Sequence, residues 1–145
     1  YTISLLKIKI MKIIALKVLI SGLTLLVISY LTLFLLVKLV PSLAEQYYDP
    51  MFSLEGEKSW MFFVHPFIIS FALAWFWLRF KSLFKGNLIM RGIEVGLFYG
   101  LIAILPSMWM IYSAFNVTLF MVISWGIYGV IQAMVAGTIS ARLNP

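Results

Sequence analysis

Long apolar stretches separated by short polar or charged breaks make up most of this 145-residue chain. A helix that crosses the hydrocarbon core of a membrane needs about 20 largely apolar residues. Stretches of that length predict four membrane-spanning helices, at about residues 18–40, 60–78, 92–112 and 117–140. The longest break, residues 41–59, is the only sizeable hydrophilic segment. The pattern therefore predicts an all-α fold, a four-helix transmembrane bundle, with residues 1–145 forming one integral membrane domain.

The composition supports a membrane protein. Hydrophobic residues make up 63% of the chain and charged residues only 11%, whereas soluble domains are about half apolar and a quarter charged. Cysteine is absent, which excludes disulfides and thiolate metal sites. The net charge of +6 could indicate nucleic-acid binding, but the basic residues lie at the ends of the apolar stretches. We therefore interpret them as determinants of membrane topology and expect no nucleic-acid partner.

The distribution of basic residues predicts the orientation. Nine of the eleven fall on one side of the membrane: Lys7, Lys9, Lys12, Lys17, Arg79, Lys81, Lys85, Arg91 and Arg142. The other side holds Lys38 and Lys58, together with Glu45, Asp49, Glu55 and Glu57. Short loops rich in lysine and arginine stay in the cytoplasm. Both termini and the 79–91 loop are therefore predicted to be cytoplasmic, and the 41–59 loop to be outside.

Two features at the N-terminal end leave alternatives open. Met11 followed by Lys12 would make a natural start, so residues 1–10 could be an extension. The segment 42–44 (Ser-Leu-Ala) resembles the cleavage site of a signal peptide. The apolar run before it is longer than a usual signal sequence and is interrupted by Lys38, so we favour retention of the first span. Cleavage would leave three spans.

Small residues at regular spacing predict how the last two spans pack. They recur every four positions in both spans, at Gly92, Gly96 and Gly100 in the third and at Gly129, Ala133 and Gly137 in the fourth. Such spacing lets two helix backbones approach closely in a membrane. Because the connection between these spans is very short, we expect the two faces to meet within one chain. The alternative is that one face serves a homo-oligomer.

Two further features concern the interior of these spans. Tyr99 and Gln132 lie at similar predicted depths, and a hydrogen bond between them would satisfy two polar groups that lipid cannot. Pro106 removes the hydrogen bond that would reach back to Ile102, so it predicts an interruption of the third span.

Few residues offer chemistry inside the predicted membrane region. Glu94 is the only carboxylate within a predicted span, and intramembrane carboxylates are candidates for proton or cation transport. We favour a structural role, because Arg91 lies three residues earlier and could pair with it. His65, the only histidine, is predicted near the outer end of the second span, where interfacial water would reach it. One histidine without companion ligands predicts no metal site, and we expect no cofactor.

One stretch resembles a known group of proteins. It runs from Arg91 through Gly100, continues with Leu105-Pro106 and Tyr112, and is followed by a glycine-rich last span. It is similar to uncharacterised small four-span membrane proteins of bacteria. The resemblance covers about the C-terminal third and implies a four-helix protein of the bacterial inner membrane. It implies no activity and no functional residues.

The sequence therefore predicts a broad function class. No hydrolytic or phosphate-binding motif is supported by its context, so we do not expect an enzyme. We expect a non-enzymatic accessory or interaction subunit whose partners are the lipid bilayer and other membrane-protein subunits or a second copy of itself. The alternative is a small oligomeric transporter or channel that uses the candidate polar positions Glu94, Tyr99, Gln132 and His65.

Overall fold

A computed structural model describes residues 2–50, 52 and 60–144 of the chain. Four helices in this part are long and apolar enough to cross a membrane: Ile10–Leu39, Trp60–Leu83, Leu88–Ala114 and Leu119–Leu143. The chain is therefore an integral membrane protein, and the prediction of an all-helical protein with four candidate spans is confirmed. The helices extend beyond the predicted apolar cores, because basic residues at their ends can keep the helical conformation while their charges reach the interface.

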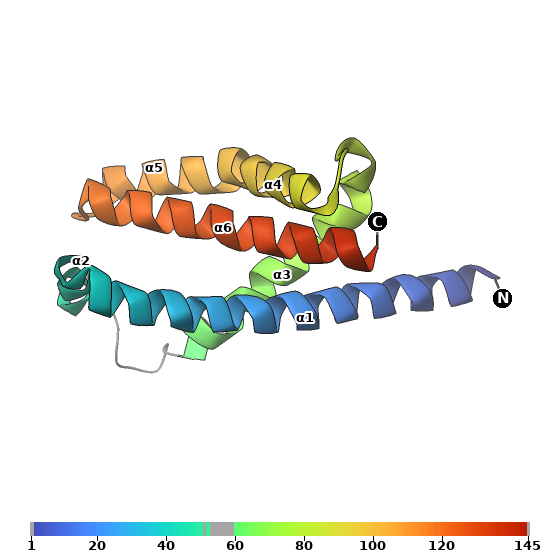
Figure 1. The fold of residues 1–145 in the computed structure, drawn as a ribbon, viewed down its shortest axis with the longest axis horizontal. Coiled ribbons are helices and arrows are strands. Elements are labelled where there is room, and N and C mark those ends of the chain that lie inside the picture. The colour runs from blue at the N-terminus through green and yellow to red at the C-terminus, as the bar shows by residue number, and fades with distance from the viewer. Residues whose placement is uncertain (1, 51, 53–59, 145) are drawn as a thin grey trace.

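The elements follow one another along the chain as Figure 1 shows. The first half contains the long helix α1 (Thr2–Leu39), the short helix α2 (Pro41–Glu45), the 3-10 turn η1 (Gln46–Tyr48), α3 (Trp60–Phe80) and the 3-10 turn η2 (Lys81–Leu83). The second half contains α4 (Leu88–Tyr99), the π-helical turn η3 (Gly100–Ile104), α5 (Leu105–Ala114) and α6 (Leu119–Leu143).

Side-chain caps fix where the last two spans begin. The Asn87 side chain accepts a hydrogen bond from the backbone N–H of Met90 (2.9 Å) at the start of α4. Thr118 accepts one from the backbone N–H of Met121 (3.3 Å) at the start of α6. Gly86, just before the first cap, has φ +97°, a conformation that residues with a side chain rarely adopt. These local signals set the tight turns on either side of the third span.

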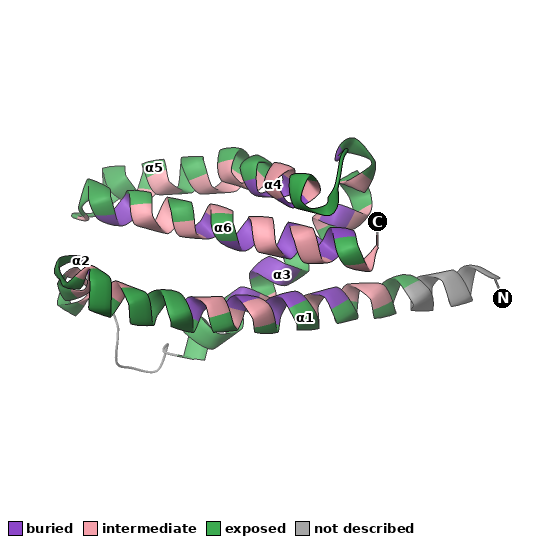
Figure 2. Cartoon of the chain, in the orientation of Figure 1, coloured by how far each residue is buried: buried purple, intermediate pink, exposed green. Residues whose placement is uncertain are grey.

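Helix α6 occupies the centre of the structure. It packs most extensively against α4 and also contacts α1 and α3, while α1 packs along α3. Figure 2 shows buried positions along α6 and in the middle of α1. The N-terminal part of α1 and the C-terminal end of α6 lie at the same end of the molecule (Figure 1). The buried cluster at the centre draws on every span and includes Leu25, Leu73, Trp77, Val95 and Ala133.

The glycines of α4 and α6 are positions where the partner helix comes close. A Cβ added to Gly137 would lie 3.3 Å from the Cα of Gly92 and 2.8 Å from the Cβ of Val95. A Cβ added to Gly96 would meet the Val130 carbonyl oxygen at 3.1 Å and overlap the Met134 side chain. Side chains of one helix thus occupy the space that glycine leaves on the other, which maximises van der Waals contact where lipid supplies no hydrophobic drive.

The third span is interrupted where the sequence predicts. The π-helical turn η3 separates α4 from α5, and Pro106 lies at the first turn of α5. Proline lacks the backbone N–H that would bond the carbonyl of Ile102, and π turns are a common adjustment within long helices. The three elements α4, η3 and α5 together form one membrane-length helix.

The first part of the predicted outer loop folds against the start of α6. Thr118 Oγ1 donates a hydrogen bond to Oε1 of Gln46 (2.6 Å), and the indole N–H of Trp125 donates one to the Tyr47 hydroxyl. Burial raises the pKa of Tyr47 above its usual range, and the hydrogen bond from Trp125 acts in the opposite direction. Residues 51 and 53–59 of this loop lie outside the described residues.

Candidate functional site: buried polar side chains and an apolar groove

Six polar side chains are buried in the described part of the chain: Lys17, Ser21, Ser29, Ser70, Gln132 and Ser140. We call these six residues the interior polar set. They come from α1, α3 and α6, the helices that contact one another at the centre of the structure. Polar groups in a membrane interior are costly unless partnered, so each member needs a structural or functional explanation.

Lys17 is the most unusual member of the interior polar set. Its side chain is 0% exposed, and its Nζ atom has no hydrogen-bond partner. Nζ lies 5.7 Å from the centroid of the Trp77 ring, where a cation–π attraction partly compensates for the loss of water. Lys17 was predicted to be one of the basic residues that determine the membrane topology. Its side chain is buried against Trp77 rather than exposed at the end of the span.

The spacing of polar residues on α1 is a sequence signal for the burial of Lys17. Lys17, Ser21, Leu25 and Ser29 follow one another at intervals of four and are all buried. Residues four apart lie on one face of a helix. The face of α1 that turns toward α3 and α6 is thus more polar than the rest of this very apolar helix, and the spacing could have identified it.

Trp77 also connects α3 to the end of α6. Its indole N–H donates a hydrogen bond to the backbone carbonyl of Asn144 (2.8 Å). The Lys81 ammonium donates one to Oδ1 of the same asparagine (3.0 Å). Trp77 itself is fully buried and stacks on Phe84, with ring centroids 5.7 Å apart. These contacts hold the C-terminal end of α6 against the turn between α3 and α4.

Tyr128 connects two members of the interior polar set, Ser29 on α1 and Gln132 on α6. Its hydroxyl shares a hydrogen bond with Oγ of Ser29 on α1 (2.5 Å) and accepts one from Nε2 of Gln132 (2.8 Å). The predicted hydrogen bond between Gln132 and Tyr99 is therefore wrong. Gln132 lies one helical turn after Tyr128 on α6, and this local partner is available without any contact between helices.

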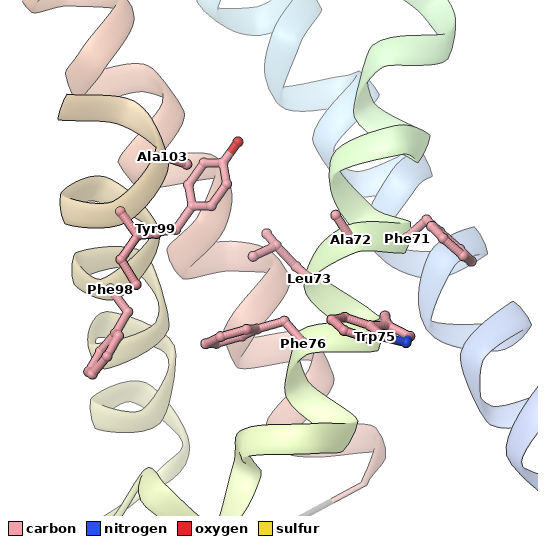
Figure 3. A pocket seen from close by; sticks show the side chains of 9 residues that line it. Phe71, Ala72, Leu73, Trp75, Phe76, Phe98, Tyr99 and Ala103 are labelled. Carbon is pink, nitrogen blue, oxygen red and sulfur yellow. The ribbon is translucent and has the colours of Figure 1, made fainter. Parts of the chain in front are cut away.

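Tyr99 instead lines an apolar groove between α3 and α4. The groove has a volume of about 430 Å³. Leu73 and Phe76 point from α3 toward Phe98 and Tyr99 on α4, as Figure 3 shows. The complete lining consists of Phe71, Ala72, Leu73, Trp75, Phe76, Phe98, Tyr99, Ile102 and Ala103. The Tyr99 hydroxyl and the Trp75 indole are the only polar side-chain groups in that lining.

Glu94 does not form the predicted ion pair with Arg91. Its Oε2 atom accepts a hydrogen bond from the backbone N–H of Lys85 (3.3 Å), in the turn before α4. The Nε atom of Arg91 is buried and has no hydrogen-bond partner. The prediction was wrong because a backbone N–H in the turn, which needs an acceptor, lies within reach of the carboxylate.

The four candidate polar positions therefore do not converge. His65 is an exposed residue near the start of α3, Glu94 lies near the start of α4, Tyr99 faces the groove, and Gln132 is buried beside Tyr128. Within residues 2–50, 52 and 60–144, no three histidine, cysteine, aspartate or glutamate side chains group together as metal ligands would. The interior polar set, of which only Gln132 was predicted, is the larger polar feature of these spans.

Comparison of the chain with protein-family models, curated proteins and solved structures finds no match. The class of protein that fold and site define is an integral membrane protein with four apolar helices of spanning length.

Proposed function

We propose that this chain is a non-enzymatic accessory or interaction subunit, a small four-helix bundle of the bacterial inner membrane. The observation that carries the proposal is the separation of Glu94, Tyr99, Gln132 and His65. A small transporter that used these groups would bring them to one water-accessible path, because ions and polar solutes need continuous solvation. Here the amide and the carboxylate have separate protein partners, and the groove that holds Tyr99 is apolar.

The proposed orientation has both termini in the cytoplasm. The C-terminal end of α6 and the turn between α3 and α4 lie at the same end of the molecule (Figure 1). Five of the eleven basic residues fall in or near these segments, and four more lie in the N-terminal part of α1 at the same end of the molecule. Helix α2 lies at the opposite end, with Glu45 in it and Asp49 nearby. Short basic segments remain cytoplasmic during membrane insertion.

The proposal is tested by photo-crosslinking in intact membranes. A photoreactive amino acid is placed at Val27 on the exposed face of α1, and in a separate variant at Ile127 on α6, both more than half exposed. We expect a discrete crosslinked product from at least one position, with another membrane protein or with a second copy of this chain. The same residue at the buried position Leu25 is the matched control, because it contacts only this chain. Crosslinks to lipid alone at every exposed position would contradict the proposal.

A second candidate function is transport, and the interior polar set is the observation that favours it. A buried lysine without a hydrogen-bond partner inside a membrane helix is a suspected functional group by default. The two candidates are separated by measuring proton and cation flux in liposomes that contain the purified chain. Flux that disappears in the Lys17→Met variant, while that variant keeps its thermal stability, would favour transport. No flux above that of empty liposomes supports the accessory role.

A further inference from the structure

A basic pocket lies beside the apolar groove, at the end of the structure where α3 turns into α4. Its volume is about 380 Å³, and it is lined by Lys81, Ser82, Phe84, Lys85, Gly86 and Arg91. Three of these side chains carry positive charge. The nearby carboxylate of Glu94 is held by the backbone N–H of Lys85 and offsets only part of that charge.

Arg91 lines this pocket together with Lys81 and Lys85. Its Nε atom is buried and has no hydrogen-bond partner. The guanidinium group can bind two oxygens of a phosphate at once, and such charge-assisted bonds are stronger than neutral ones. The pocket therefore presents three cationic side chains to an anionic oxygen group.

The basic pocket and the apolar groove share an aromatic wall. Phe84 lines the pocket, and its ring lies 6.0 Å from that of Phe76 and 5.7 Å from that of Phe98, both of which line the groove. A further cation lies near the groove, because the Arg79 guanidinium is 5.3 Å from the centroid of the Trp75 ring. The apolar groove thus lies next to a cluster of cations, with Phe84 between them. This combination matches an anionic headgroup attached to an acyl chain.

We propose that the groove between α3 and α4, together with the basic pocket, binds one anionic phospholipid. The headgroup phosphate contacts Arg91 and Lys85, and one acyl chain lies along Phe76, Phe98 and Ile102. Basic pockets between membrane helices near the cytoplasmic surface recognise anionic headgroups in this manner. The position also explains why α3 and α4 are separated by a groove although a short turn connects them: the lipid fills the space and links the two helix pairs, α1 with α3 and α4 with α6.

The test uses the full chain purified in mild detergent, with its melting temperature measured against added lipid. Dioleoyl phosphatidylglycerol is the anionic probe and dioleoyl phosphatidylcholine the neutral one. We expect the anionic lipid to raise the melting temperature and the neutral lipid to raise it much less. Arg91→Gln should weaken the apparent affinity for the anionic lipid about tenfold, the loss expected for one charge-assisted contact. Arg142→Gln, an exposed basic position on α6, is the matched control and should leave the affinity unchanged.

A second variant tests the acyl chain. Ala72 lies in the groove lining, so Ala72→Phe should narrow the groove and remove most of the stabilisation by phosphatidylglycerol. Ala114→Phe, at an exposed position at the end of α5, is its control. Equal stabilisation by both lipids, or equal losses in the Arg91 and Arg142 variants, would overturn the proposal. Retained stabilisation in Ala72→Phe would overturn it as well.

Two other ligands could occupy the groove and the basic pocket, and each would give a different result in these measurements. A soluble phosphate would be revealed if glycerol 3-phosphate raised the melting temperature as strongly as phosphatidylglycerol, and this result would reject the lipid. A second copy of the chain would be revealed by light scattering, if Ala72→Phe converted a dimer to a monomer while phosphatidylglycerol had no effect on stability. Either result can occur whether or not the proposed accessory function is correct.

Discussion

Lys17 and Trp77 lie together in the interior of the protein, with the lysine ammonium 5.7 Å from the centroid of the indole ring and without a hydrogen-bond partner. The two residues belong to α1 and α3, which pack along one another. A fully buried ammonium is normally held by a carboxylate or by several carbonyl oxygens. Replacing Lys17 by an apolar side chain should therefore increase the stability of the protein.

Replacing Lys17 by methionine should stabilise the protein. Methionine has a similar length, keeps the contact with Trp77 and removes the cost of burying a charge, so we expect a gain of about 1–3 kcal/mol. The measurement is the thermal unfolding of both forms in the same detergent. Lys12→Met, at an exposed position on α1, is the control and should change stability by less than about 0.5 kcal/mol. A lower melting temperature for Lys17→Met would mean that the ammonium makes a stabilising interaction.

Adding a methyl group to Gly92 should separate α4 from α6. A Cβ at this position would lie 2.9 Å from the Met134 carbonyl oxygen and overlap Oγ1 of Thr138, and overpacking of this kind costs about 1–3 kcal/mol. Gly126→Ala is the matched control, because its Cβ would have its nearest neighbour at 3.6 Å, an ordinary contact. We expect Gly92→Ala to lower the melting temperature and Gly126→Ala to leave it unchanged or raise it. Equal effects would exclude close helix approach as the role of Gly92.

Removing the Tyr128 hydroxyl should cost stability. Tyr128→Phe deprives Gln132 of its acceptor and breaks the bond to Ser29, which keeps only its bond to the Leu25 carbonyl. Interhelical hydrogen bonds in membranes contribute about 0.6–2 kcal/mol. Tyr112→Phe, at an exposed position on α5, is the control. A double-mutant cycle with Ser29→Ala then isolates the bond between α1 and α6. Strictly additive effects of the two substitutions would show that this bond contributes nothing.

Replacing Glu94 by glutamine should change stability little. The glutamine side chain keeps an acceptor oxygen for the backbone N–H of Lys85, so the expected loss is below about 1 kcal/mol. Growth of cells that depend on the chain should also be unaffected. Unchanged thermal stability combined with a lost growth phenotype would instead assign Glu94 a role in carrying protons or cations.

The proposed membrane orientation can be measured with reporter fusions. A reporter that is active only outside the cytoplasm should be inactive when fused after Pro145 and active when inserted at Ser53. The nine basic residues on one side of the predicted topology motivate this expectation. Activity of the fusion at Pro145 would reverse the predicted orientation.

The sequence predicted the membrane spans and the pairing of the last two helices more successfully than the contacts of individual polar residues. Span length follows from local composition, and the short turn between α5 and α6 makes these helices neighbours. The partners of Gln132 and Glu94 were both assigned wrongly, to Tyr99 and Arg91. Tyr128 lies one helical turn before Gln132, much nearer in the sequence than Tyr99. Lys85 lies farther from Glu94 than Arg91 does, and only the turn before α4 brings its backbone N–H to the carboxylate.

By itself, the sequence determined four helices that are long and apolar enough to cross a membrane, because such a helix satisfies its backbone hydrogen bonds internally and matches the hydrocarbon thickness. Apart from the small-residue faces of α4 and α6, only the tertiary structure decided which face of a helix is buried. In water, apolar periodicity separates the core from the surface, but here both the lipid and the protein interior are apolar. The hydropathy pattern therefore does not distinguish them. For this reason the contacts of Tyr128 and the groove beside Tyr99 emerged only when the helices were placed against one another. The burial of Lys17 had a sequence signal, the four-residue spacing of polar positions on α1.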